Sequence, residues 1–242
     1  MPTLVLLFQL LLKLLLVLGG GLAIAYLAAC IFLLFRQNRF IFFPAPVSET
    51  TPAALNLTYQ DIWIPIATAT GKTEQLHGWW IPAAGPEQSV ILYLHGNGAN
   101  VGATVSHCHR LHQLGLSTFV FDYRGYGRSE GRFPTETQVY ADTQAAWNYL
   151  TQVREIPPAH ILLYGHSLGG AIAIDLAVKQ PEVAGLIVES SFTSMRQMVD
   201  VRGGFGLFPI DLLLTQKFNS LEKVRSLKMP VLFIHGTLDL TV

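Results

Sequence analysis

Charged residues and cysteines are both scarce in this sequence, which argues against a nucleic-acid-binding protein and against a disulfide-stabilised one. Only 13% of the 242 residues are charged, and 16 Lys and Arg residues balance 16 Asp and Glu residues, so the formal net charge is zero. No basic stretch with interleaved aromatic residues occurs, which argues against a nucleic-acid partner. The two cysteines, Cys30 and Cys108, lie in an apolar run and in a predicted helix and do not indicate a disulfide framework.

Hydrophobic residues, by contrast, make up half of the chain, and the longest apolar run stands at the N-terminus. Residues 14–35 alone are long enough to cross the hydrocarbon layer of about 30 Å as a helix. Arg36 and Arg39 end the run and aromatic residues follow, which is typical of the headgroup boundary. We therefore predict a single span over about residues 14–35, within an N-terminal membrane anchor of residues 1–35.

Two other interpretations of this run stay open. A cleaved signal peptide has an apolar core of about 7–15 residues, which is shorter than this run. Residues 27–30 read Leu-Ala-Ala-Cys and resemble a lipoprotein cleavage site, but residues 31–35 continue the apolar run past the cysteine. The uncleaved anchor is the preferred interpretation. The positive charge that follows the span predicts that the rest of the chain lies on the cytoplasmic side.

Behind the anchor, a proline-containing linker over residues 36–56 precedes a region of alternating short apolar strands and helices. This alternation is typical of a mostly parallel sheet with helices on both faces. Residues 57–242 therefore form one predicted α/β domain, and the roughly 200 residues behind the anchor suffice for its core. Strands are expected at 57–64, 75–81, 89–94, 117–121, 161–164, 185–188 and 231–234. Helices are expected at 104–114, 135–154 and 171–179, with short helices of a cap region in 194–214 and one more from Ser220.

The strongest chemical signal is the motif Gly165-x-Ser167-x-Gly169, which follows a predicted strand and precedes a predicted helix. A serine in so tight a turn has a strained backbone, and the residues two positions away must be small. The turn lifts the hydroxyl oxygen clear of the sheet and aims the N-terminus of the following helix at the reacting centre. Ser167 is therefore the candidate nucleophile, and a glycine-rich turn without chemistry is the alternative.

Acyl transfer also requires preorganised N–H donors for the oxyanion of the tetrahedral intermediate. The residue after the nucleophile supplies one donor, which is here the backbone N–H of Leu168. The second is expected from the loop after an earlier strand, where residues 95–98 read His-Gly-Asn-Gly, and we assign it to the backbone N–H of Asn97. A plain glycine turn is the alternative for this loop, and His95 is expected to be structural.

The acid that orients the catalytic histidine is expected after the nucleophile in the chain. Asp239 follows the strand predicted at 231–234 and is the preferred candidate, while Glu189 is the alternative. No histidine follows Asp239, and His166 is adjacent to Ser167 and cannot fold back onto its hydroxyl. We therefore expect the base to lie outside these 242 residues, and the domain to lack its last strand and helix.

A cluster on the helix predicted at 104–114 invites a metal interpretation, since it contains His107, Cys108, His109 and His112. Cys108 and His112 share a helix face at four-residue spacing. No further ligand set with zinc spacing accompanies them. A polar helix face is the preferred interpretation, so neither a metal nor a cofactor is expected.

Several motifs in fixed order make the sequence recognisable. They are Leu94-His95-Gly96-Asn97-Gly98, Asp122-Tyr123-Arg124-Gly125-Tyr126-Gly127-Arg128-Ser129, Gly165-His166-Ser167-Leu168-Gly169-Gly170, Glu189-Ser190-Ser191-Phe192-Thr193 and His235-Gly236-Thr237-x-Asp239. Over about residues 40–239 the chain resembles the membrane-anchored α/β-hydrolase-domain family, which includes bud-emergence-type proteins and protein depalmitoylases. This resemblance implies that Ser167 is the nucleophile and Asp239 the triad acid, while the family's histidine has no counterpart in this chain.

The sequence therefore predicts a membrane-anchored serine hydrolase of the α/β-hydrolase fold that cleaves a carboxylic ester or thioester through an acyl-enzyme. Its expected partners are a small-molecule or acyl-protein substrate and membrane lipid. Two alternatives stay open, namely a serine peptidase on the same fold and a non-catalytic membrane scaffold. Because an unactivated serine is a poor nucleophile, residues 1–242 without the base are expected to show no measurable turnover.

Overall fold

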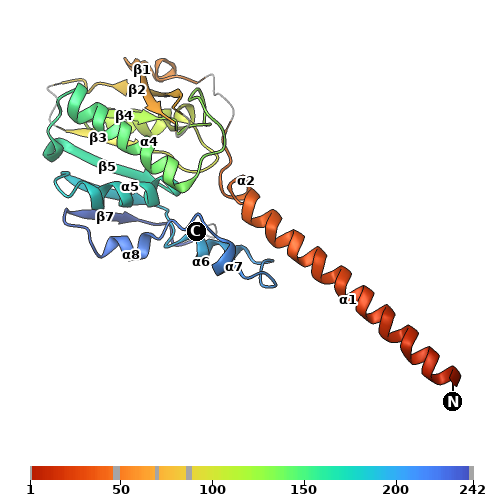
Figure 1. The fold of residues 1–242 in the computed structure, drawn as a ribbon. Helices are drawn as coiled ribbons and strands as arrows, with labels where there is room; N and C mark the ends of the chain where they lie inside the picture. Colours follow the sequence, from red (N-terminus) through yellow and green to blue (C-terminus); the bar gives the residue numbers. More distant parts are fainter. Residues whose placement is uncertain (1, 46–49, 69–70, 86–88, 240–242) are drawn as a thin grey trace.

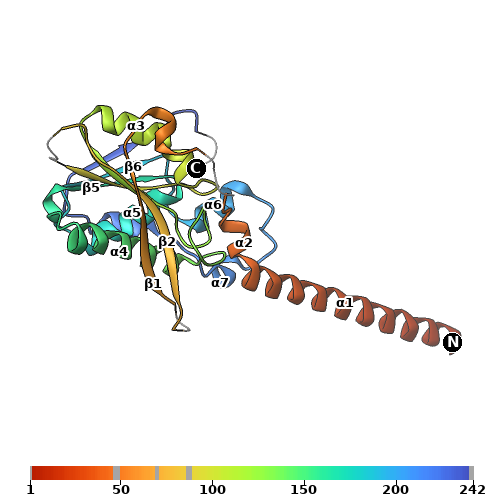
Figure 2. The same ribbon diagram turned by 90° about the horizontal axis from the view of Figure 1, so that it is seen from above.

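A long helix projects from an α/β domain in the computed structural model, which describes residues 2–45, 50–68, 71–85 and 89–239 (Figure 1). This helix, α1 (Pro2–Arg36), is followed by the short helix α2 (Asn38–Ile41) where the chain meets the domain (Figure 2). Most of α1, the segment Thr3–Arg36, is long and apolar enough to cross a membrane. The side chains of residues 3–28 are exposed, and α1 contacts the domain through its C-terminal turns, from Tyr26 onward.

The described residues form a seven-stranded sheet in the order β1-β2-β4-β3-β5-β6-β7. β1 pairs antiparallel with β2 and β2 pairs antiparallel with β4, while the other neighbours are parallel. The strands are β1 (Gln60–Ala67), β2 (Thr73–Ile81), β3 (Val90–Leu94), β4 (Ser117–Phe121), β5 (Ile161–His166), β6 (Gly185–Glu189) and β7 (Val231–Ile234). This mostly parallel sheet is the one that the alternating pattern predicted.

Helices cover both faces of the sheet, as predicted. They are α3 (Val105–Gln113), α4 (Glu136–Asn148), α5 (Leu168–Lys179), α6 (Met195–Arg202), α7 (Ile210–Leu213) and α8 (Ser220–Val224). Short 3₁₀ turns add Pro52–Leu55, Val101–Thr104 and Pro158–His160.

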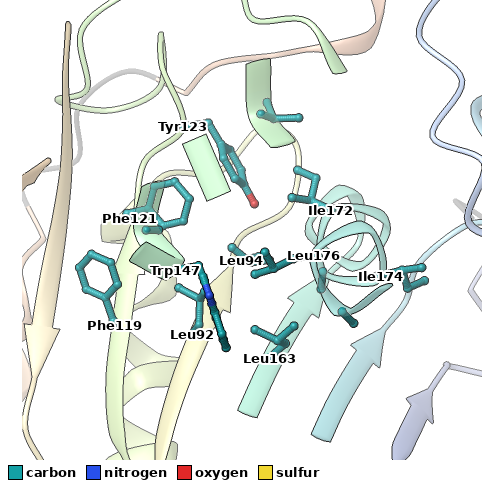
Figure 3. Packing of buried hydrophobic residues seen from close by; sticks show 14 of the residues in the cluster. Leu92, Leu94, Phe119, Phe121, Tyr123, Trp147, Leu163, Ile172, Ile174 and Leu176 are labelled. Carbon is teal, nitrogen blue, oxygen red and sulfur yellow. The ribbon is translucent and has the colours of Figure 1, made fainter. Parts of the chain in front are cut away.

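The central strands are buried on both faces, which explains why they read as continuous apolar runs. Neighbouring residues of a strand point to opposite faces. Leu92 and Leu94 of β3 therefore join one hydrophobic cluster with α4 and α5 (Figure 3). Ile91 and Tyr93 join a second cluster with α3 on the opposite face. Because β3 is held from both sides, its carboxyl end is a rigid support for a site.

The predicted elements are present, with differences at their ends. β1 begins at Gln60, because the chain first makes the 3₁₀ turn that ends at Asn56 in a left-handed conformation. α5 begins at Leu168, three residues before the predicted start, because the glycines of the motif lie inside the helix. Thr135 caps α4 as predicted, in a capping box with Gln138, and the predicted helix ends in a π-helical turn. α6 and α7 occupy the predicted cap region, residues 194–214, which we call the cap segment.

Candidate active site

The carboxyl ends of β3 and β5 meet where the strand order of the sheet reverses. The chain passes from β3 to β4 on one side and later places β5 on the other side of β3. In open α/β sheets, ligands bind in the crevice outside the strand ends at such a switch point. Leu94 of β3 pairs with Gly165 of β5, so the loop at residues 95–98 and the turn at Ser167 begin side by side. The fold thus brings two of the predicted site segments together.

Ser167 joins β5 directly to α5 in a conformation that is rare for a residue with a side chain. Its φ is 53° and its ψ is −120°, which costs of order 1–3 kcal/mol. Its N–H donates to the carbonyl of Glu189 at 2.9 Å, and its carbonyl accepts from the N–H of Gly170 at 2.9 Å and the hydroxyl of Ser191 at 2.8 Å. The side chain is half-buried, and it lies at the positive end of the α5 dipole.

Two glycines of the motif are required by close approaches of the backbone. A Cβ atom on Gly165 would lie 2.3 Å from the carbonyl oxygen of Gly169. A Cβ atom on Gly169 would lie 2.0 Å from the carbonyl oxygen of Leu94. Because backbone atoms cannot yield as a flexible side chain does, glycine is required at position 165 by the packing of β5 against the start of α5, and at position 169 by the packing of α5 against β3.

The two candidate oxyanion donors lie on the two neighbouring segments. Gly96 packs against the turn, since a Cβ atom there would lie 3.0 Å from Nδ1 of His166 and 3.1 Å from Cβ of Ser167. Among the residues that the structure describes, the backbone N–H groups of Asn97 and Leu168 have no hydrogen-bond partner. Unpartnered N–H groups close to a serine hydroxyl are what the stabilisation of an oxyanion requires.

The side chain of Asn97 makes contacts that the sequence did not indicate. Its Oδ1 accepts hydrogen bonds from the N–H of Phe43 and from the hydroxyl of Tyr126, both at 2.8 Å, and its Nδ2 donates to the carbonyl of Ile41. Ile41 and Phe43 belong to the segment by which the chain leaves α1. The side chain therefore fastens this segment to the loop that carries the Asn97 N–H, and the 54-residue separation from Phe43 leaves no local pattern to find it by.

Asp239 follows β7, which lies two strands from β5, or about 10 Å at the usual strand spacing. Its N–H donates to the carbonyl of Gly236 at 3.0 Å, and its Oδ2 lies 3.8 Å from Nε2 of His235. The side chain is 18% exposed. Asp239 thus lies at the same edge of the parallel sheet as Ser167, across a gap that an imidazole ring would have to bridge.

Glu189, the alternative acid, is engaged by another side chain. Its Oε2 accepts a hydrogen bond from the hydroxyl of Tyr164 at 2.6 Å. Burial, together with this contact to a carboxylate, raises the pKa of Tyr164. The ring of Tyr164 stacks on that of Tyr93 at a centroid distance of 5.0 Å. Glu189 therefore holds two aromatic rings in place beside the turn at Ser167.

The buried carboxylate of Asp122 lies close to His95, the first residue of the loop at residues 95–98. The oxygens of Asp122 lie 3.6 Å from Nε2 of His95 and 3.8 Å from Nδ1 of His77, and Oδ1 accepts the N–H of Val101 at 2.8 Å. Nδ1 of His95 contacts the carbonyl of Gly96 at 2.9 Å and so carries a proton. Burial lowers the pKa of His95, and Asp122 offsets this only in part. His95 is therefore neutral at pH 7, as suits a structural histidine.

Within the described part of the chain, no histidine forms a hydrogen bond with the Ser167 hydroxyl. The ring of His166 lies near His107 of α3, with centroids 6.3 Å apart. The same residues contain no group of three or more His, Cys, Asp or Glu side chains that could hold a metal. Cys108 of the predicted cluster is buried, with its Sγ 3.6 Å from Oγ1 of Thr104.

A family model that matches more than half of the chain decides the classification. The model described as serine aminopeptidase, S33 (Hydrolase_4) matches residues 85–221. This chain belongs to the α/β-hydrolase family. The matched residues of the hydrolase include β3, β5, the turn at Ser167 and the cap segment.

Three relatives extend the similarity beyond the matched range. An uncharacterised protein of Mycobacterium tuberculosis is 35% identical over 205 residues, which cover 84% of this hydrolase and 70% of that protein. The α/β hydrolase domain-containing protein WAV2 of Arabidopsis thaliana is 31% identical over 242 residues, with 91% and 75% covered. Protein bem46 of Schizosaccharomyces pombe is 29% identical over 216 residues, with 85% and 71% covered. These relatives confirm the predicted link to the bud-emergence group.

Two solved structures share the fold. An α/β hydrolase of Vibrio vulnificus superimposes with a TM-score of 0.67 at 25% identity, covering 81% of this chain and 71% of that one. The esterase PF2001 of Pyrococcus furiosus also gives a TM-score of 0.67, at 23% identity and with 84% and 78% covered. The second likeness shows the fold alone.

Proposed function

We propose that this hydrolase cleaves carboxylic esters or thioesters by forming an acyl-enzyme on Ser167. The observation that carries the proposal is the backbone of Ser167, held at φ 53° between β5 and α5 by hydrogen bonds on both of its peptide groups. Strain of this kind persists only where the surrounding structure enforces it, and it clusters at active sites. Here it presents a half-buried hydroxyl at the switch point of the sheet.

In the proposed reaction the Ser167 oxygen attacks the acyl carbon while a histidine takes the hydroxyl proton. The backbone N–H groups of Leu168 and Asn97 hold the oxyanion, and each such donor contributes about 10²–10³ in rate. The histidine then protonates the leaving group, and water releases the acyl group from the serine. Asp239 orients this histidine and stabilises the imidazolium. None of the described residues is assigned as this base.

Labelling with a fluorophosphonate probe tests the nucleophile. We expect Ser167→Ala to abolish labelling of the natural protein in its membrane, because the probe reacts only with an activated serine. Ser106→Ala is the matched control, since it removes an exposed serine hydroxyl on α3 and leaves the hydrogen bonds that hold the turn at Ser167 in place. Undiminished labelling of Ser167→Ala would reject the assignment and leave the membrane scaffold as the better description.

An apolar cavity supports an acyl group as part of the substrate. The cavity measures about 70 Å³ and lies between the C-terminal end of α1 and the cap segment. It is lined by Leu33, Gln37, Phe40, Ile41, Val199, Phe205, Ile210, Leu213 and Leu214. The carbonyl of Ile41, one of these lining residues, accepts a hydrogen bond from the side chain of Asn97, the residue whose backbone N–H is a proposed oxyanion donor. Its apolar lining supports an acyl lipid or an acyl-protein as the proposed substrate class.

A serine peptidase is the second candidate, because the matching family model is described as a serine aminopeptidase. Both reactions use the same nucleophile and oxyanion donors, so the site geometry does not separate them. Turnover of acyl esters and thioesters should exceed turnover of peptides with free N-termini when both panels are offered to the natural protein. A preference for the peptides would favour the second candidate.

We further propose the arrangement of the chain at the membrane. Residues 1–35 form a single-pass anchor, residues 36–56 a linker and residues 57–242 the hydrolase domain. Arg36 and Arg39, which follow the apolar run, support a cytoplasmic position of the domain. The proposed substrate would then be an ester or thioester reached from that side of the membrane.

A further inference from the structure

The cap segment lies along the C-terminal turns of α1. The hydroxyl of Tyr26 donates to the carbonyl of Leu207 at 2.9 Å, and the ring of Tyr26 stacks on that of Phe208 with centroids 5.8 Å apart and planes 3° from parallel. Cys30, one turn further along α1, is buried. Nε2 of Gln37 donates to the carbonyl of Leu213 at 3.1 Å. These contacts follow one face of the helix, as the spacing of α-helical residues requires.

The contacts of Tyr26 with Leu207 and Phe208 show how far the cap segment extends along α1 toward its N-terminus. Ten residues separate Tyr26 from Arg36, which corresponds to about 15 Å along the axis. The headgroup layer on each side of the hydrocarbon is only about 5–8 Å thick. If Arg36 marks the outer boundary of the headgroups, Leu207 and Phe208 therefore lie below the headgroup layer, among the upper parts of the acyl chains.

The composition of this part of the cap segment suits that depth. Residues 203–210 read Gly-Gly-Phe-Gly-Leu-Phe-Pro-Ile and carry no charge, and we call them the cap loop. Leu207 in the loop is 85% exposed, and Leu212 just behind it is 82% exposed. Exposed apolar side chains cost little in lipid, whereas in water a patch of them marks an interaction surface. The carbonyl of Leu207 is already bonded to Tyr26, which removes one penalty of placing loop backbone in lipid.

The charged residues around the cap loop are compatible with a membrane surface. The two acidic side chains of the cap segment, Asp200 and Asp211, both bind Arg196, the latter at 2.6 Å. Neither carboxylate is therefore left unpaired toward lipid phosphates. Arg202, at the end of α6, is exposed beside the loop, where a cation favours anionic headgroups.

We propose that the cap loop inserts into the acyl-chain layer beside the anchor, as a second and interfacial contact with the lipid. The inference rests on the proposed role of α1 as a membrane anchor. Interfacial elements bury their apolar face about 5–10 Å into the boundary between headgroups and acyl chains, which agrees with the depth set by Tyr26. Two contacts, a span and a loop, would fix the tilt of the domain and hold the apolar cavity against the lipid.

Depth-dependent quenching of a fluorescent label tests this contact on the whole chain in phosphatidylcholine vesicles. Single cysteines are introduced by Leu207→Cys and Leu212→Cys in the loop region, Leu16→Cys in the middle of α1, and Leu114→Cys after α3. All four positions are exposed, so labelling with an environment-sensitive dye leaves the packing intact. Cys30 and Cys108 are buried, and the protein without an introduced cysteine serves as the blank. The quencher is a phospholipid with a nitroxide near the top of its acyl chain.

We expect quenching at positions 207 and 212 to exceed that at position 114 at least about threefold, because only groups at acyl-chain depth meet the nitroxide. Strong quenching at position 16 together with quenching at 207 no greater than at 114 would overturn the loop insertion while keeping the anchor. A dye at 207 that is shifted to the blue but not quenched would also overturn it, since another protein surface would then cover the loop. Absence of quenching at 16 as well as at 207 would reject anchor and insertion together.

Discussion

At the scale of single residues, the site depends on positions where the backbone is strained or closely packed. Ser167 keeps its strained backbone because the Glu189 carbonyl, the Gly170 N–H and the Ser191 hydroxyl bond both of its peptide groups. Gly169 is needed for a different reason, namely the contact of its backbone with Leu94 of β3. A substitution that disturbs the backbone at either position is expected to change the conformation of the whole turn, and so to lower both the stability of the protein and its activity.

Gly169→Ala should destabilise the hydrolase by about 3 kcal/mol, because the added Cβ atom would lie 2.0 Å from the backbone oxygen of Leu94 and force the turn away from β3. Thermal unfolding in detergent micelles measures the effect. Gly206→Ala is the control, since nothing lies within 4 Å of a Cβ atom there. Equal unfolding temperatures for the two variants would contradict the close packing of the turn.

His95 should make stability depend on pH. Burial lowers the pKa of His95 in the folded state, whereas in the unfolded chain it is about 6.5. A depressed folded pKa stabilises the protein above the unfolded value, and this stability is lost as the pH falls below 6.5, by up to about 1.4 kcal/mol per pH unit. Denaturant unfolding at pH 7.5 and pH 5.5 measures the loss.

His95→Asn should reduce this slope, since its amide can keep the bond to the Gly96 carbonyl without taking up a proton. Burial also lowers the pKa of His107, so part of the slope should persist. His160→Gln replaces an exposed histidine as the control. An unchanged slope in His95→Asn would show that the buried imidazole is not the group responsible.

At the scale of elements, the joint between anchor and domain is made by polar side chains. Gln37 lies between α1 and α2, is 9% exposed and joins the two to the end of the cap segment. Its Nε2 donates to the carbonyls of Leu34 and Leu213, and its Oε1 accepts the N–H groups of Thr215 and Gln216. The side-chain amide of Gln37 thus makes hydrogen bonds to four backbone groups, and it fixes the position of the end of the cap segment relative to α1.

Gln37→Ala should loosen this joint. Buried backbone groups that lose their partners cost about 1–3 kcal/mol each unless water replaces the bond. We expect amide hydrogen exchange at residues 213–216 to accelerate, while exchange in β3 and β5 stays unchanged. Gln113→Ala, at the exposed end of α3, is the matched control. Equal protection of residues 213–216 in the two variants would show that apolar packing alone holds the cap segment.

At the scale of the whole molecule, the described chain consists of one long apolar helix and one α/β domain. α1 stands clear of the domain over most of its length (Figures 1 and 2). The domain is attached through the last turns of α1, through Gln37 and through the bonds of Asn97 to Ile41 and Phe43. A chain built in this way should leave the membrane only when detergent dissolves the lipid.

The position of the domain can be measured with Leu114→Cys, an exposed site after α3. A maleimide that does not cross membranes should modify this cysteine only after the cells are permeabilised, because the positive charge after the span favours a cytoplasmic domain. Carbonate washing should leave the protein in the pellet in the same experiment. Modification in intact cells would reverse the proposed orientation, and release by carbonate would argue against a spanning helix.

Local patterns in the sequence sufficed for the long apolar helix, the order of strands and helices along the chain and the turn at Ser167. The apolar run, the alternation of short apolar strands with helices and the Gly-x-Ser-x-Gly spacing all express interactions between residues close in the chain. The ends of elements were less predictable, as at the start of α5, where Gly169 lies inside the helix because β3 approaches its backbone closely, although glycine usually weakens a helix. The roles assigned to Ser167, Asp239, Asn97 and Leu168 stay predictions.

What the sequence determined by itself was therefore the set of elements and the position of Ser167 in a tight turn between a strand and a helix. Only the tertiary structure decided that the Asn97 side chain holds the segment that follows α1, and that the cap segment lies against α1. The physical reason is separation along the chain: Gln37 and Leu213 are 176 residues apart, and Tyr26 and Leu207 are 181 apart. Such contacts form only when the whole sheet has assembled, and no local periodicity records them.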